Sequence, residues 1–354
     1  MISKLNDDLL KYQIVPFLEQ EDIYSLYTVN KYLYKLINCY VIISPTIPCC
    51  EKYCFDENYR KSIDSKIGNK QLKLDIDFHI NDYSILKNVH IIKFALFNQD
   101  INIKGTKTHT LLFENIKHIN FINIGNVKNV KIYECENIEN IHILGNLHSL
   151  ELSRCNITDV SVLDNIKTLR INNCNNITDV SNLGKIHNLT ITCCNGITDV
   201  SALGNVYKLD LSYCYNITDV SALGNVHTLS LRGCRGINDI THLKNIHTLD
   251  LSGCYNITDV SALGNVHTLD LSGCYNITDV STLENLNTLR LFSSHNITDV
   301  SMLGKIQNLT ITCCNGITDV SALGNVYALY LYGCNGITDV SALGNVHTLL
   351  LSDC

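Results

Sequence analysis

Residues 266–285 read VHTLDLSGCYNITDVSTLEN, and near copies of this twenty-residue unit follow one another through the second half of the chain. Leucine therefore returns at a constant spacing. A fixed period of this length predicts a solenoid, in which each copy forms one rung and contacts only the neighbouring rungs. The leucines are Leu169, Leu189, Leu209, Leu229, Leu249, Leu269, Leu289, Leu309, Leu329 and Leu349.

Apolar residues lie three positions apart through most of the unit, and the spacing shortens to two only at Leu269 and Leu271. A spacing of two places both leucines on one face of an extended strand and Asp270 on the other face. Spacings of three suit 3-10 turns better than an α-helix. Each unit therefore predicts one short strand followed by turns.

The position two residues after the repeated cysteine holds only asparagine or glycine in the regular copies. Both residues tolerate a left-handed backbone better than other residues do, so we expect a turn with positive φ there. The residues are Asn176, Gly196, Asn216, Gly236, Asn256, Asn276, Asn296, Gly316 and Gly336.

An apolar residue followed by xxLxLxxCxxI, read from Val266 onward, resembles the leucine-rich repeat. The next residues, Ile277, Thr278 and Asp279, resemble both the cysteine-containing repeats of F-box proteins and the short repeats of bacterial internalins. The resemblance implies an α/β solenoid with a parallel β-sheet on the concave face and mostly 3-10 or turn structure on the convex side. A parallel β-helix is the alternative architecture.

Degenerate copies extend the array toward the N-terminus, because residues 80–89 (INDYSILKNV) align with ITDVSALGNV without a gap. We therefore expect about fifteen rungs over residues 72–354, a connector over residues 41–71 and a different unit over residues 1–40. The early strands are expected at Leu72, Ile92, Leu111, Val130 and Leu150.

The apolar pattern of residues 1–40 predicts three short helices. This segment resembles an F-box, although the proline and the tryptophan usual in that family are replaced by Asn6 and Leu33. The resemblance implies that the segment binds the F-box adaptor of a cullin complex. A helical cap over the open end of the solenoid is the alternative. The implied adaptor-binding residues are Leu5, Leu9, Leu10, Ile14, Leu18, Ile23 and Leu26.

The net charge of −7 and the pI of about 6.0 show no excess of basic residues of the kind that nucleic-acid binding needs. No stretch of the sequence is long and apolar enough to span a bilayer, and the first residues, MISKLNDDLL, carry no apolar signal segment. We therefore expect an intracellular, cytoplasmic protein with reduced cysteines and no membrane partner.

Eleven of the seventeen cysteines occupy one position of the repeat, which Ser294 fills once, and this pattern predicts thiols packed in the core. They are Cys135, Cys155, Cys174, Cys194, Cys214, Cys234, Cys254, Cys274, Cys314, Cys334 and Cys354. Four further cysteines, at 39, 49, 50 and 54, lack the paired spacing of a zinc site. No metal and no cofactor are expected.

An aspartate recurs from Asp159 to Asp339 every twenty residues, in the setting Thr-Asp-x-Ser. A ladder of calcium-binding or catalytic carboxylates is one interpretation, and capping of a turn in each rung is the favoured one. Histidines such as His227 and His247 precede the strands, where surface packing is favoured over metal binding. An enzyme has one active site, whereas every candidate catalytic residue of this chain recurs in each repeat. We therefore expect no enzyme.

Strand residues that face away from the core change from copy to copy, and such variation predicts a recognition surface. We expect target binding at Arg170, Asp210, Tyr213, Arg232, Asp250, Asp270, Arg290, Phe292, Tyr330 and Tyr332. A second stripe after the cysteines serves either binding or packing between rungs. Its residues are Tyr215, Tyr255 and Tyr275, together with Arg235 and His295.

An F-box followed by leucine-rich repeats resembles the substrate-recognition subunits of cullin-type ubiquitin ligases, which are not themselves catalytic. The composition and the near-identical repeats resemble repeat proteins of large amoeba-infecting DNA viruses, which implies host proteins as targets in the host cytoplasm. A plain interaction scaffold, with the N-terminus acting only as a cap, is the alternative. The final strand at Leu349 is followed by no closing turn, so self-association at this rung is also expected.

Overall fold

The computed structural model describes residues 42–43, 47–67, 71–77, 80, 82–95 and 99–354. The expected F-box-like segment, including Leu5 and Leu9, lies outside the described residues. The chain divides into two compact units, one ending at Ile143 and the other running from Leu144 to Cys354.

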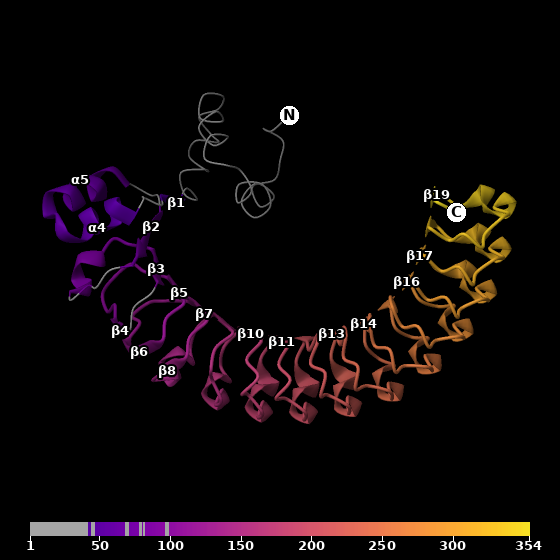
Figure 1. Cartoon of the computed structure of the whole chain (residues 1–354), viewed down its shortest axis with the longest axis horizontal. Coiled ribbons are helices and arrows are strands. Elements are labelled where there is room, and N and C mark those ends of the chain that lie inside the picture. Colours follow the sequence, from indigo (N-terminus) through magenta and orange to yellow (C-terminus); the bar gives the residue numbers. More distant parts are fainter. Residues whose placement is uncertain (1–41, 44–46, 68–70, 78–79, 81, 96–98) are drawn as a thin grey trace, which may run out of the picture. The chain divides into compact units, whose positions relative to one another are not determined.

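In the second unit, parallel strands pair in chain order, and a 3-10 helix lies between successive strands. Figure 1 shows these strands along the inner side of the unit's curve and the 3-10 helices along the outer side. The strands are β9 (Ser149–Ser153), β10 (Thr168–Asn172), β11 (Asn188–Thr192), β12 (Lys208–Asp210), β13 (Thr228–Ser230), β14 (Thr248–Asp250), β15 (Thr268–Asp270), β16 (Thr288–Phe292), β17 (Asn308–Thr312), β18 (Ala328–Tyr332) and β19 (Thr348–Ser352). The 3-10 helices are η6 (Ser161–Leu163), η7 (Ser181–Lys185), η8 (Ser201–Asn205), η9 (Ser221–Asn225), η10 (Thr241–Leu243), η11 (Ser261–Leu263), η12 (Ser281–Leu283), η13 (Ser301–Lys305), η14 (Ser321–Asn325) and η15 (Ser341–Asn345).

The strand register follows directly from the period. Leu249 pairs with Leu229 on one side and with Leu269 on the other, so identical side chains stack along the sheet. Leu251, two residues further, is completely buried, whereas Asp250 between the leucines is only half-buried. This alternation is that of a strand with one face against the core. The expected solenoid with a parallel sheet and outer 3-10 turns is confirmed.

The left-handed residue of each rung is not where the sequence suggested. Positive φ occurs immediately before the repeated cysteine, for example at Tyr213 and Gly253, and not two residues after it. At the expected position, asparagine instead bonds the previous rung: Asn256 Nδ2 donates to the Arg235 carbonyl oxygen at 2.6 Å. Where glycine stands there, as at Gly196, an added Cβ would collide with a carbonyl oxygen of the previous rung. The expectation was wrong because contact between rungs, and not φ, restricts this position.

The repeated cysteines form a buried ladder inside the sheet. Cys254 Sγ donates to the Leu231 carbonyl oxygen at 3.0 Å, and Cys234 Sγ donates to the Leu211 carbonyl oxygen at 3.1 Å. Burial raises the pKa of Cys234 to about 12, which keeps its thiol protonated at neutral pH. The core assignment is confirmed along the ladder except at Cys354, which is exposed.

The first unit continues the same parallel pairing, with strands where the degenerate copies predicted them. Its main sheet contains β1 (Ile42–Ile43), β2 (Gln71–Ile76), β3 (Ile91–Ala95), β5 (Thr110–Glu114) and β7 (Asn129–Tyr133), with the 3-10 helix η4 (Tyr83–Leu86) after β2. A second sheet, which the sequence did not predict, contains β4 (Gln99–Asn102), β6 (His118–Asn123) and β8 (Asn137–Glu139). The 3-10 helix η5 (Ile141–Leu144) follows β8.

Two helices, α4 (Ile47–Phe55) and α5 (Glu57–Ile67), occupy the segment expected to be a connector. Tyr53 is buried between them and its hydroxyl donates to Asp64 Oδ1 at 2.6 Å. Arg60 donates to the carbonyl oxygens of Tyr53 and Cys54 at 3.1 and 2.9 Å, so one guanidinium ties the end of α4 to α5.

Candidate binding surface

The inner face of the second unit carries a row of carboxylates at its centre. Asp210 pairs in register with Ser230, Ser230 with Asp250, and Asp250 with Asp270. Asp250 Oδ1 accepts hydrogen bonds from the amide and the hydroxyl of Ser252 at 2.8 and 2.6 Å. The carboxylates are therefore held in fixed positions by serines of their own rungs, half-buried and facing away from the core.

Arginines are spread around this row. Arg290, next in register after Asp270, lies 4.0 Å from it between Nη1 and Oδ2, which is a weak ion pair at an exposed site. Arg170 lies exposed on β10, and Arg232 lies exposed just after β13. The expected target-binding residues of both charges thus share the inner side of one unit, with the acidic residues between the outermost arginines.

Aromatic side chains dominate the inner face toward the C-terminus. Phe292 on β16 is 47% exposed, and Tyr330 and Tyr332 lie half-buried on β18. Tyr213 instead lies in the turn after β12, where its ring covers the backbone of Gly233: an added Cβ there would lie 2.6 Å from the ring. The inner face therefore changes from a charged centre to an aromatic end.

The second stripe of the sequence forms a continuous stack. The Arg235 guanidinium carbon lies 5.3 Å from the Tyr215 ring centroid and 5.1 Å from that of Tyr255, and the Tyr255 and Tyr275 rings stack at 5.4 Å. The sequence left binding and packing as alternatives. In the structure, packing occupies the faces of these groups, while Tyr215 and Tyr275 remain 41% and 44% exposed.

A second aromatic column lies just before the strands, and the sequence analysis did not include it among the binding candidates. His187, Tyr207, His227, His247 and His267 stack ring on ring, with centroid separations of 4.8, 4.6, 4.7 and 4.5 Å. The expected surface packing of these histidines is confirmed. The sequence signal that could have predicted this column is the recurrence of histidine or tyrosine at one repeat position in successive rungs.

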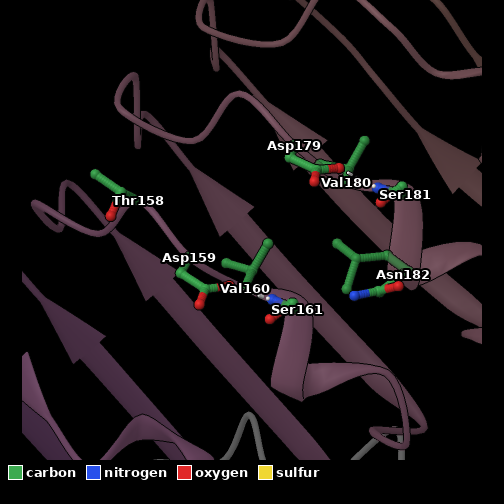
Figure 2. Close-up of a pocket in the computed structure, with 9 residues that line it drawn as sticks. Thr158, Asp159, Val160, Ser161, Asp179, Val180, Ser181 and Asn182 are labelled. Atoms are coloured by element: carbon green, nitrogen blue, oxygen red, sulfur yellow. Dashed lines mark hydrogen bonds between the residues drawn. The ribbon is translucent and has the colours of Figure 1, made fainter.

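The repeated aspartates cap the turns on the other side of each rung. Asp159 Oδ1 and Asp179 Oδ1 accept from the backbone amides of Ser161 and Ser181, both at 2.8 Å. Figure 2 shows these two bonds beside a shallow groove between the rungs, with a volume of about 190 Å³. A similar groove between later rungs is lined by Asp279 and its neighbours. Capping, the interpretation favoured from sequence, is confirmed, because the bond recurs in every regular rung.

These caps predict a loss of stability in acid. Hydrogen bonds from Ser261 hold the pKa of Asp259 below its usual value, and the same cause lowers the pKa of its equivalents. A carboxyl with a depressed folded-state pKa stabilises the fold above its unfolded value, which is about 3.9, and loses this contribution as pH falls through the folded value. We expect the melting temperature to fall between pH 5 and pH 3, as measured by circular dichroism.

The control for this prediction is a variant with Asp259→Asn and Asp279→Asn, in which two caps no longer titrate. Its melting temperature should depend less steeply on pH over the same interval than that of the unchanged chain. Parallel curves for the two proteins would show that other carboxylates cause the acid sensitivity.

Two further properties concern the described part of the chain only. Among the residues that the structure describes, no three His, Cys, Asp or Glu side chains come together as a metal-binding group. None of the helices in the described ranges combines the length and the apolar character needed to span a membrane.

Comparisons with protein-family models and with curated protein sequences give no match. Among solved structures, internalin InlF of Listeria monocytogenes aligns at 20% identity over 86% of this chain and 93% of its own, with a TM-score of 0.55. The functional domain of InlJ from the same species aligns at 20% identity over 73% of this chain and 66% of its own, with a TM-score of 0.42. A leucine-rich-repeat protein of Leptospira interrogans aligns at 17% identity over 84% of this chain and 95% of its own, with a TM-score of 0.36. The similarity to InlF, together with the strand register, shows that this chain has the leucine-rich-repeat fold.

Proposed function

We propose that this chain is a non-catalytic protein-interaction receptor that binds a target protein on the inner face of its repeat array. The observation that carries the proposal is the contrast between constant and variable positions. Leu249, Leu269 and their equivalents are buried in every regular rung before β19, whereas the half-buried or exposed residue that follows is Ser230, Asp270 or Arg290. A constant frame with a variable face, rich in arginine and aromatic residues, is typical of protein recognition.

The finer proposal is that the chain is the substrate-recognition subunit of a cullin-type ubiquitin ligase. Its support is the F-box resemblance of residues 1–40, which implies docking on an adaptor and the cullin complex. In this proposal the chain acts in the cytoplasm, and its resemblance to viral repeat proteins makes host proteins the targets. The alternative is a leucine-rich-repeat scaffold with no role in ubiquitin transfer, whose N-terminus only caps the solenoid.

Binding to a purified F-box adaptor tests the finer proposal. We expect the unchanged chain to co-purify with the adaptor, and a variant with Leu5→Asp and Leu9→Asp to lose this binding, because charges would replace apolar contact residues. Lys11→Asp is the matched control, since it changes a charge in the same segment outside the implied contact residues. Failure of the unchanged chain to bind the adaptor would favour the scaffold alternative.

A second copy of the chain is a further proposed partner. Leu350 and Leu351 on β19 are 45% and 41% exposed, and β19 pairs with β18 on one side only in the described chain. An exposed apolar strand with an unpaired edge favours association. We propose that two copies meet through this strand.

A further inference from the structure

Arg235 is held in an unusual way for an exposed side chain. It follows β13 and lies between Tyr215 and Tyr255, which occupy the same position in the rungs before and after it. Each ring attracts the guanidinium through its π face. The N–H donors of a guanidinium lie in one plane and point outward from its carbon, so a ring on each side of that carbon leaves these donors for other partners.

This guanidinium makes no hydrogen bond or ion pair with the residues that the structure describes. Two other exposed cations of the unit have a carboxylate partner: Lys305 donates to Glu284 at 2.9 Å, and Arg290 lies near Asp270. Holding a long side chain in one conformation has an entropic cost, which the two tyrosines offset before any ligand arrives. Arg235 is therefore pre-arranged as a donor without an acceptor.

The charge of this rung also differs from that of its neighbours. Where the adjacent rungs carry Asp210 and Asp250 on the inner face, this rung carries Ser230, and it adds Arg232 three residues before Arg235. The rung thus presents two arginines and no inner-face carboxylate. A single positive rung between two acidic ones favours a small, singly charged anion over a densely charged one.

We propose that Arg235, clamped between Tyr215 and Tyr255, binds one side-chain carboxylate of an extended segment in the target protein. The inference rests on the proposed role of the repeats in target binding and names the chemistry of the target. The planar edge of a guanidinium matches the two oxygens of a carboxylate, so that two parallel hydrogen bonds form. Asp or Glu in an extended segment crossing the rung at β13 supplies this group.

The test is a titration of the full chain, labelled with ¹⁵N-arginine, with three capped peptides that differ at one residue type. The first peptide carries one glutamate among serines, the second replaces this glutamate by glutamine, and the third replaces it by phosphoserine. We expect the side-chain Nε–Hε signal of Arg235 to shift with the glutamate peptide and not with the glutamine peptide. The shift should weaken with added salt, because exposed charges are screened.

Two variants separate the clamp from a general effect of charge. Arg235→Lys keeps the charge but loses the planar fork, and we expect it to weaken binding about 10-fold or more. Lys244→Gln removes an exposed charge after η10 in the same rung, away from the stacked tyrosines; it is the control and should bind like the unchanged chain. Both sites are on the surface, so unchanged melting temperatures check that the fold is intact in each variant.

Equal affinity for the glutamate and glutamine peptides, or equal binding by Arg235→Lys, would overturn the proposal. Tighter binding of the phosphoserine peptide would overturn the choice of a carboxylate as the ligand. Adaptor binding through residues 1–40 is measured independently. If the adaptor binds and the peptide does not, this inference alone fails, whereas peptide binding without the adaptor leaves it in place and removes the ubiquitin role.

Discussion

Replacing Leu251 with aspartate is expected to unfold the rungs around β14, whereas replacing Cys254 with serine in the same rung is expected to have little effect. Leu251 is completely buried, so aspartate would place a charge in the core without a partner. The truncation of a buried leucine to alanine already costs roughly 2 to 5 kcal/mol, and the buried charge adds to this. The loss should be largest in the adjacent rungs, because a solenoid contacts only its neighbours.

The contrast with Cys254→Ser comes from the chain itself. Ser294 occupies the equivalent position, is buried and donates to the Phe292 carbonyl oxygen at 3.5 Å. Serine at 254 keeps an acceptor within reach, because Cys254 Sγ already donates to the Leu231 carbonyl oxygen. We expect a loss of about 1 kcal/mol. Thermal melts and amide exchange of both variants measure the effect, and equal losses of stability would contradict the assignment of the two positions.

Deleting Asp250–Leu269, a segment of twenty residues, is expected to leave a folded array shorter by one rung. The deletion joins Leu249 to Asp270, so the sequence resumes at the same position of the repeat. The new neighbours pair as Leu229 and Leu249 pair now, because every regular rung has the same register. The far-UV circular dichroism per residue should stay nearly constant, and the melting transition should remain cooperative.

Deleting only Asp250–Asp259 is the matched comparison, and the smaller deletion should cause more damage. The array can resume only if the remaining half-rung is expelled as a loop, which exposes Leu263 and Val266. Each exposed side chain costs about 1.5 to 3 kcal/mol. At about 2 to 4 °C per kcal/mol, we expect a melting temperature about 10 °C lower than that of the parent. Equal melting temperatures for the two deletions would contradict a repeat-by-repeat architecture.

Some of the binding surface was predictable from sequence, because side-chain direction follows the strand alternation. Asp250 and Arg290 were expected on the inner face, and the structure places them there, beside the buried leucines of β14 and β16. Their use in binding stays a prediction. Packing of Arg235 against the tyrosines of the neighbouring rungs was one of the two alternatives that the sequence left open, and only the structure shows that both rings contact the guanidinium.

The sequence by itself determined the period, the strand positions and the capping aspartates. These features are local or repeat exactly, so a spacing of two at Leu269 and Leu271, or Asp259 two residues before Ser261, is enough to fix them. It also predicted the buried cysteines, because they share one repeat position that Ser294 fills once without disturbing the pattern.

Only the tertiary structure decided the features that join one rung to the next. The left-handed residue lies before the cysteine, and the asparagine at 256 bonds the carbonyl oxygen of Arg235 in the previous rung. The helices α4 and α5 and the second sheet of the first unit were likewise absent from the sequence-based expectation. The physical reason for the rung-to-rung features is that they depend on how closely neighbouring rungs approach each other. That distance is set by packing between residues about twenty positions apart, and no local pattern of the chain encodes it.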